Sequence, residues 1–118
     1  MFLNFDTGKN IYKCKLSTQA LCDIEDILGC NPVNILVTDS NELPKLKSLL
    51  VILYHSMKDF NHGIKFADIY DIFDEYCANE GDFSTLLEFI MNLFEESQLI
   101  KSKGDSTTDT TEGQDSKN

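Results

Sequence analysis

The 118-residue sequence contains no arginine and no tryptophan, and all ten of its basic residues are lysines. Without arginine, the chain lacks the planar side chain that contacts phosphate groups and guanine edges through two hydrogen bonds at once. Twenty Asp and Glu residues bring the formal net charge to −10, so the overall field repels nucleic acid. We therefore expect no binding to DNA or RNA.

Long apolar runs are also missing from the chain. The longest uninterrupted run, Leu49 to Tyr54, has six residues, whereas a membrane-spanning helix needs about 20. The N-terminal segment from Met1 to Asp6 lacks the basic start and the longer apolar stretch of a secretory signal. These features predict a protein without a membrane span that is made and kept in a cytoplasm.

The cysteines and histidines show no recognisable metal-binding or catalytic spacing. Four cysteines are spread along the chain without a Cys-x-x-Cys pair: Cys14, Cys22, Cys30 and Cys77. We expect them to be free, mostly buried thiols. The alternative is a zinc site formed by two of them with His55 and His62, but zinc ligands usually come as closely spaced pairs. We predict no metal, no cofactor and no enzymatic activity, because no catalytic motif or glycine-rich phosphate loop is present.

The first third of the chain predicts a β-hairpin followed by a helix. Two segments with strand character, Phe2 to Phe5 and Ile11 to Leu16, flank a turn-rich pentad that contains one glycine. A helix is then predicted over Thr18 to Leu28. Ser17 or Thr18 offers an N-cap for it, and Gly29 supplies its C-terminal stop.

The rest of the chain is predicted to be helical up to residue 100. The expected segments are a short turn from Pro32 to Leu36, a central helix from Pro44 to Met57, a third helix from about Phe66 to Ala78 and a last helix from Phe83 to Ile100. Gly81 separates the last two helices, and Asp82 is well placed as an N-cap. The central helix is apolar on nearly all sides, which is typical of a helix with neighbours all around it.

The predicted fold class is mainly α, of the α+β type. It consists of an N-terminal β-hairpin followed by a compact bundle of about four to five helices, in a single domain over residues 1–100. Residues 101–118 contain no Ala, Val, Ile, Leu, Met, Phe, Trp, Tyr or Cys. They cannot bury enough surface to offset the entropy of ordering, so they are predicted to form a disordered polar tail.

The last predicted helix has more apolar residues than one core contact requires. Phe83 to Ile100 carries ten apolar side chains in eighteen positions, and most of them fan across roughly 200° of the helix. We expect this helix to be largely core, with one edge available to a partner. The candidate partner-binding residues on it are Leu86, Phe89, Ile90, Leu93 and Phe94.

The third predicted helix carries an acidic strip, formed by Asp68, Asp71, Asp74 and Glu75, which lie within about 120° of one another. A solvated face is the simplest explanation of this strip. The alternatives are a docking strip for a partner that bears Lys or Arg and, with much less support, a metal or catalytic site.

The order of these segments resembles that of a known protein family. The predicted hairpin running into a capped helix, over Ile11 to Gly29, is similar to the opening of the tail assembly chaperones of long-tailed bacteriophages. The central helix, the helix with an acid-rich outer face and the closing helix follow in the same order. The resemblance covers most of residues 1–100 and rests on pattern, since no invariant motif is present.

The resemblance implies a non-enzymatic protein that binds the phage tape measure protein, keeps it soluble and helps to recruit tail tube protein. Such a chaperone acts in the cytoplasm of the host bacterium and is not part of the mature virion. Members of the family often have a longer form produced by ribosomal frameshifting; whether this chain has one is left open, as is self-association. The alternative function is a small acidic phage-encoded adaptor or inhibitor that docks a basic protein partner.

Overall fold

The computed structural model describes residues 2–36 and 43–97 of the chain. The elements in chain order are β1 (Leu3–Asp6), β2 (Ile11–Cys14), α1 (Thr18–Leu28), α2 (Val33–Leu36), α3 (Leu46–Met57), α4 (Asp68–Cys77) and α5 (Phe83–Glu96). The predicted mainly α fold with an N-terminal hairpin is therefore confirmed. The predicted tail and the end of the last predicted helix lie outside the described residues. No helix in the described part of the chain is long and apolar enough to cross a membrane.

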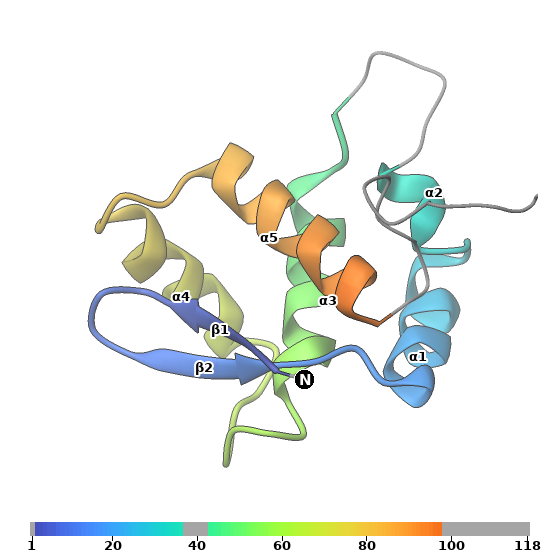
Figure 1. Cartoon of the computed structure of the whole chain (residues 1–118), viewed down its shortest axis with the longest axis horizontal. Helices are drawn as coiled ribbons and strands as arrows, with labels where there is room; N and C mark the ends of the chain where they lie inside the picture. Colours follow the sequence, from blue (N-terminus) through green and yellow to red (C-terminus); the bar gives the residue numbers. More distant parts are fainter. Residues whose placement is uncertain (1, 37–42, 98–118) are drawn as a thin grey trace, which may run out of the picture.

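Helix α3 occupies the centre of the molecule. It packs against α1, α5, β2 and α4, and α5 crosses in front of it in the view of Figure 1. The most deeply buried apolar side chains of α3 are Leu49, Ile52, Leu53 and Met57, each with 0% of its surface exposed. Burying a side chain of this kind stabilises the fold by about 1.5–3 kcal/mol, so α3 organises the single hydrophobic core of the described residues.

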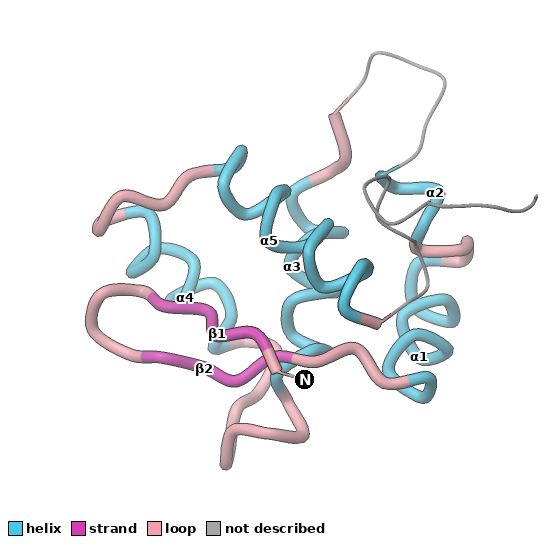
Figure 2. Tube along the Cα trace, in the orientation of Figure 1, coloured by secondary structure: helices cyan, strands magenta, loops and turns pink. Residues whose placement is uncertain are grey.

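The two strands form an antiparallel hairpin along one edge of an otherwise helical molecule (Figure 2). In its register, Leu3 pairs with Cys14 and Phe5 pairs with Tyr12. The outer edge of β2 is closed by Asn61, whose side-chain amide accepts from the Lys13 N–H at 3.1 Å and donates to the Lys13 carbonyl at 2.8 Å. One asparagine thus takes the place of a neighbouring strand and connects the hairpin to the segment after α3.

The ends of α1 and α5 follow the capping signals in the sequence. The Ser17 hydroxyl accepts from the Ala20 N–H at 3.1 Å, and Gly29 ends α1 in the left-handed conformation with φ 74°. At the start of α5, the Asp82 carboxylate accepts from the Thr85 N–H at 2.8 Å, and the Thr85 hydroxyl accepts from the Asp82 N–H at 2.9 Å. These caps satisfy N–H groups that have no partner within the helix.

The turn between α4 and α5 uses its glycine in an unexpected way. The positive φ of this turn, 108°, falls on Glu80 and not on Gly81. The Gly81 N–H donates to the Tyr76 carbonyl at 2.9 Å, the pattern of a Schellman motif in which Glu80 holds the position usually taken by glycine. Gly81 is required for a different reason, because a Cβ there would lie 2.4 Å from the Tyr76 ring.

Replacing Glu80 with glycine should raise the free energy of unfolding by about 1 kcal/mol, because glycine adopts a positive φ without steric cost. Glu80→Gln removes the same charge but keeps the Cβ, so its stability should match that of the wild type. Gly81→Ala should be destabilising because of the Tyr76 ring. Urea titrations followed by circular dichroism measure all three variants. This explanation fails if Glu80→Gly is no more stable than Glu80→Gln.

Candidate protein-binding surface

Four of the five apolar residues predicted to face a partner from α5 lie inside the core. Leu86, Ile90, Leu93 and Phe94 are each 0% exposed. The fifth, Phe89, is half-buried, and its ring lies 5.1 Å from the Phe5 ring of the hairpin. The wide apolar arc of α5 is thus used by several neighbours within the chain. In this fold the four buried residues form no surface, so binding through them remains a prediction that would require α5 to move.

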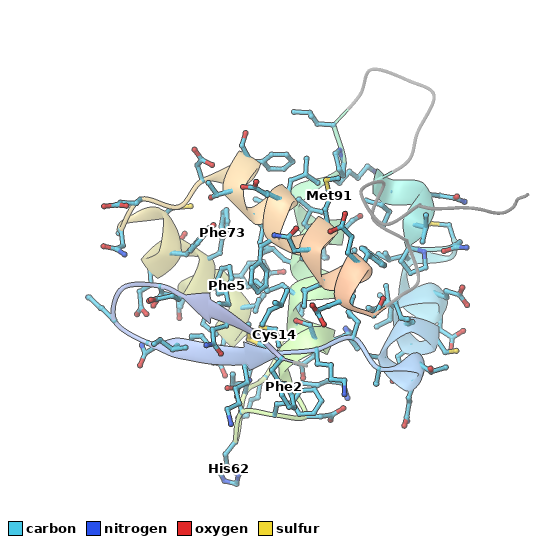
Figure 3. All side chains as sticks on the ribbon, viewed as in Figure 1. Phe2, Phe5, Cys14, His62, Phe73 and Met91 are labelled. Atoms are coloured by element: carbon cyan, nitrogen blue, oxygen red, sulfur yellow. The ribbon has the colours of Figure 1, made fainter. Side chains whose placement is uncertain are left out.

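One large apolar side chain of α5 does reach solvent. Met91 is 46% exposed and stands on the outer side of the helix, whereas Phe5 and Phe73 point into the interior between the hairpin, α4 and α5 (Figure 3). Phe73 packs beside Tyr76 with ring centroids 6.1 Å apart. The outward side of α5 therefore offers a single exposed large apolar side chain and not an apolar face.

Three members of the acidic strip are exposed on α4: Asp68, Asp71 and Asp74. The Asp68 carboxylate accepts from the Lys65 N–H at 2.9 Å and so closes the turn that leads into α4. No lysine in the described residues lies within ion-pair distance of these carboxylates, since the one salt bridge found there joins Lys58 to Asp59 at 3.5 Å. Their charges are available to a partner.

The fourth member, Glu75, belongs to the anchoring of the hairpin. Its Oε1 atom accepts from the Thr7 hydroxyl and from the Asn10 side-chain amide, the latter at 2.9 Å. Thr7 is 0% exposed and also accepts from the Asn10 N–H at 3.0 Å. The hydrogen bonds from Thr7 and Asn10, with a contribution from the charge of Lys9, lower the pKa of the Glu75 carboxyl from its ordinary value of 4.5. Glu75 thus holds the hairpin turn against α4.

An apolar groove lies between α1, α3 and the segment that leads into α4. It has a volume of about 260 Å³, and its lining residues are Ile27, Lys47, Val51, Tyr54, His55 and Phe66. Ligand pockets for drug-sized molecules range over about 300–1,000 Å³, so this groove has the size to accept one or two side chains of another protein. Ile27, on its rim, is 58% exposed.

A row of aromatic rings extends this groove along α4. The Tyr54 and Phe66 rings lie 5.5 Å apart, and Phe66 lies a further 5.5 Å from the ring of Tyr70. Both pairs meet edge to face, the arrangement favoured by the charge distribution of aromatic rings. Tyr70 is 46% exposed. The rings thus form a continuous wall from the floor of the groove to the outer surface of α4.

His55 has a structural role beside the groove. Its side chain is only 7% exposed, and its Nδ1 atom lies 2.9 Å from the Val51 carbonyl oxygen. A carbonyl can only accept, so Nδ1 carries the proton and donates it. His62, by contrast, points into solvent from the loop after α3 (Figure 3).

All four cysteines are free, as predicted, but the prediction that most are buried is wrong. Cys14 is buried, which raises the pKa of its thiol to about 11. Cys22, Cys30 and Cys77 are exposed, because they lie on the outer faces or beyond the ends of their helices. Among residues 2–36 and 43–97, no group of three or more His, Cys, Asp or Glu side chains could hold a metal ion.

A polar depression of about 220 Å³ lies beside the turn between α4 and α5, lined by Asp6, Tyr76, Asn79, Glu80, Gly81 and Thr85. The two hydroxyl groups in its lining, of Tyr76 and Thr85, are already hydrogen-bonded within the chain. Thr85 Oγ1 accepts from the Tyr76 hydroxyl at 2.6 Å and donates to the Asp82 carbonyl at 3.0 Å. The depression is therefore explained by helix capping, and the apolar groove is the stronger candidate for binding.

Comparison of the chain with protein-family models, with characterised proteins and with solved structures yields no match.

The apolar groove was not predicted from the sequence. Two signals in the sequence point to it. Val51 and Tyr54 give α3 a second apolar face, and Ile27 lies outside the main apolar stripe of α1.

Truncation on α5 should separate core residues from surface residues. Leu93→Ala should lower the free energy of unfolding by about 2–5 kcal/mol, because it leaves a cavity in the core. Met91 is 46% exposed on the same helix. Met91→Ala should therefore change the free energy of unfolding by no more than about 0.5 kcal/mol. Chemical denaturation of both variants measures the difference. Similar small effects for the two variants would show that α5 is not packed as described.

The anchoring role of Glu75 predicts a pH-dependent stability. Because the pKa of Glu75 is lowered on folding, its contribution is complete above about pH 4.5 and is lost as the pH falls through the lowered value in the folded protein. Glu75→Gln should therefore be less stable than the wild type at neutral pH, and the difference should shrink in acid. Urea titrations across this pH range measure it. Glu88→Gln, an exposed residue of α5, should show no such trend, and equal behaviour of the two variants would refute the anchor.

Proposed function

We propose that this chain is a non-enzymatic tail assembly chaperone of a long-tailed bacteriophage. In this proposal it binds apolar helical segments of the tape measure protein, keeps that protein soluble and helps to recruit tail tube protein. It acts in the cytoplasm of the host bacterium and does not remain in the mature virion.

The observation that carries the proposal is an apolar groove on the surface of an otherwise acidic domain. Val51 forms the buried floor of the groove, Ile27 stands exposed at its side, and the exposed ring of Tyr70 lies against the lining residue Phe66. Such a groove can accept the apolar face of a helix, as grooves in other helix-binding proteins do. The net charge of −10 keeps the carriers apart from one another and so keeps a bound apolar segment in solution.

The order of the elements supports the same proposal. The hairpin leads directly into a helix that is capped by Ser17 and ended by Gly29, within the segment on which the resemblance to tail assembly chaperones rests. A central apolar helix, a helix with an acidic outer face and a closing helix then follow, as in that family. This support comes from the arrangement of elements and not from a shared motif.

An acidic adaptor or inhibitor that docks a basic protein is the second candidate. It is favoured by the distribution of charge, because residues 66–97 contain nine Asp and Glu and no Lys. The dependence of partner binding on salt concentration distinguishes the two functions, since exposed charges are screened beyond about 10 Å at 0.1 M ionic strength. Binding led by charge should vanish between low and moderate salt, whereas capture of an apolar segment should persist.

Co-expression with the tape measure protein of the same gene cluster tests the proposed function. We expect a larger soluble fraction of the tape measure protein and a complex that co-purifies at moderate salt. The matched control is co-expression with Leu93→Ala, which should lose the effect to the extent that the domain unfolds. Folded wild-type chain that neither solubilises the tape measure protein nor co-purifies with it would refute the proposal.

A further inference from the structure

We propose that the groove between α1, α3 and the start of α4 binds an amphipathic helix of one particular kind. This helix carries Leu, Ile or Phe on one face and Lys or Arg on both flanks. The inference rests on the proposed function for the identity of the client protein, but the chemistry of the bound segment follows from the groove itself.

The face of α3 that borders the groove is about three helical turns long. Lys47, Val51, Tyr54 and Lys58 follow one another at spacings of four, three and four residues, so they share one face of α3. This face is about 16 Å long. Its middle is apolar, and its two lysines stand at its two ends, Lys47 among the residues that line the groove.

Similar pairs of residues stand beside the groove on α1 and on α4. On α1, Asp23 lies one helical turn before the lining residue Ile27. On α4, Asp74 lies one turn after Tyr70, whose ring meets that of the lining residue Phe66. Residues four apart lie on the same side of a helix, so each apolar wall residue has a carboxylate beside it. Neither aspartate has a salt bridge within the described part of the chain.

This arrangement selects the charge on the flanks of the bound helix. In the proposed complex, a helix that lies along Val51 and Tyr54 has the α1 side, with Asp23, along one flank and the α4 side, with Asp74, along the other. Lys or Arg at those flanks gains an ion pair, whereas Asp or Glu there meets a like charge. The apolar floor provides affinity, and the aspartates provide the choice between basic and acidic amphipathic helices.

Three synthetic peptides of about 18 residues, long enough to form helix on binding, test this choice. The first has a Leu face with Lys elsewhere, the second has the same Leu face with Glu elsewhere, and the third has Ser in place of each Leu of the first. Fluorescence anisotropy at about 150 mM salt measures their binding to the whole chain. We expect the Leu–Lys peptide to bind at least about tenfold more tightly than either of the others.

A matched pair of variants locates the binding. The groove variant is Ile27→Ala with Tyr70→Ala, and the control is Ile11→Ala with Met91→Ala. The truncated residues are similarly exposed, 58% and 46% in the groove variant against 62% and 46% in the control. Ile27 lines the groove and Tyr70 contacts its lining residue Phe66, whereas the control residues neither line the groove nor belong to its row of aromatic rings. The groove variant should weaken binding of the Leu–Lys peptide by about tenfold, and the control should leave it unchanged.

Several results would overturn the inference. Equal binding of the Ser–Lys peptide would mean that charge alone is recognised, and equal loss in both variants would place the site elsewhere. A wild-type dimer that the groove variant converts to a monomer in sedimentation would assign the groove to a second copy of the chain.

Co-purification of the tape measure protein with the same two variants separates this inference from the proposed function. Undiminished co-purification with the groove variant would refute the groove as the client site and leave the function standing. Binding of the Leu–Lys peptide by a wild-type chain that captures no tape measure protein would refute the function and leave the groove standing.

Discussion

The packing of other elements around α3 is the constraint on which the rest of the structure depends. A helix that is apolar on nearly all sides must be covered on nearly all sides, and α1, α5, α4 and the hairpin share this task. Leu49 and Leu53 are completely buried on the side of α3 opposite Val51. On the side of Val51, residues of α1 and of the segment leading into α4 border an apolar groove whose floor is the buried Val51.

The hairpin is held in place by polar contacts at both of its ends. Two strands alone are marginally stable, so they need support from outside the sheet. Glu75 on α4 holds the turn through Thr7 and Asn10, and Asn61 after α3 pairs with the backbone of Lys13. The Phe5 side chain, between these anchors, is then fixed in the core beside Tyr76 and Phe89. The acidic residue that sequence reasoning assigned to a docking strip thus takes part in building the fold.

Local signals made the elements predictable from the sequence. Ser17, Gly29 and Asp82 act through neighbouring residues only, and the structure shows each of them in its predicted role. The burial of Leu86 and Ile90 was harder to predict, because the periodicity of α5 does not say how many neighbours share its apolar arc. The groove depends on how α1 and α4 are placed around α3, which spacing along the chain does not specify. Gly81 shows the same limit on a smaller scale, since its need for a small side chain comes from the nearby ring of Tyr76 and not from a positive φ.

The central claim is that a client helix is bound in the groove while the apolar face of α5 stays in the core. Isoleucine methyl NMR tests it most directly, because Ile27 lies on the groove, Ile90 lies in the core on α5 and Ile11 is exposed on the hairpin. On titration with the Leu–Lys peptide, the methyl signal of Ile27 should shift, and those of Ile90 and Ile11 should stay in place. A shift of Ile90 with Ile27 unmoved would contradict the claim and return the binding site to α5.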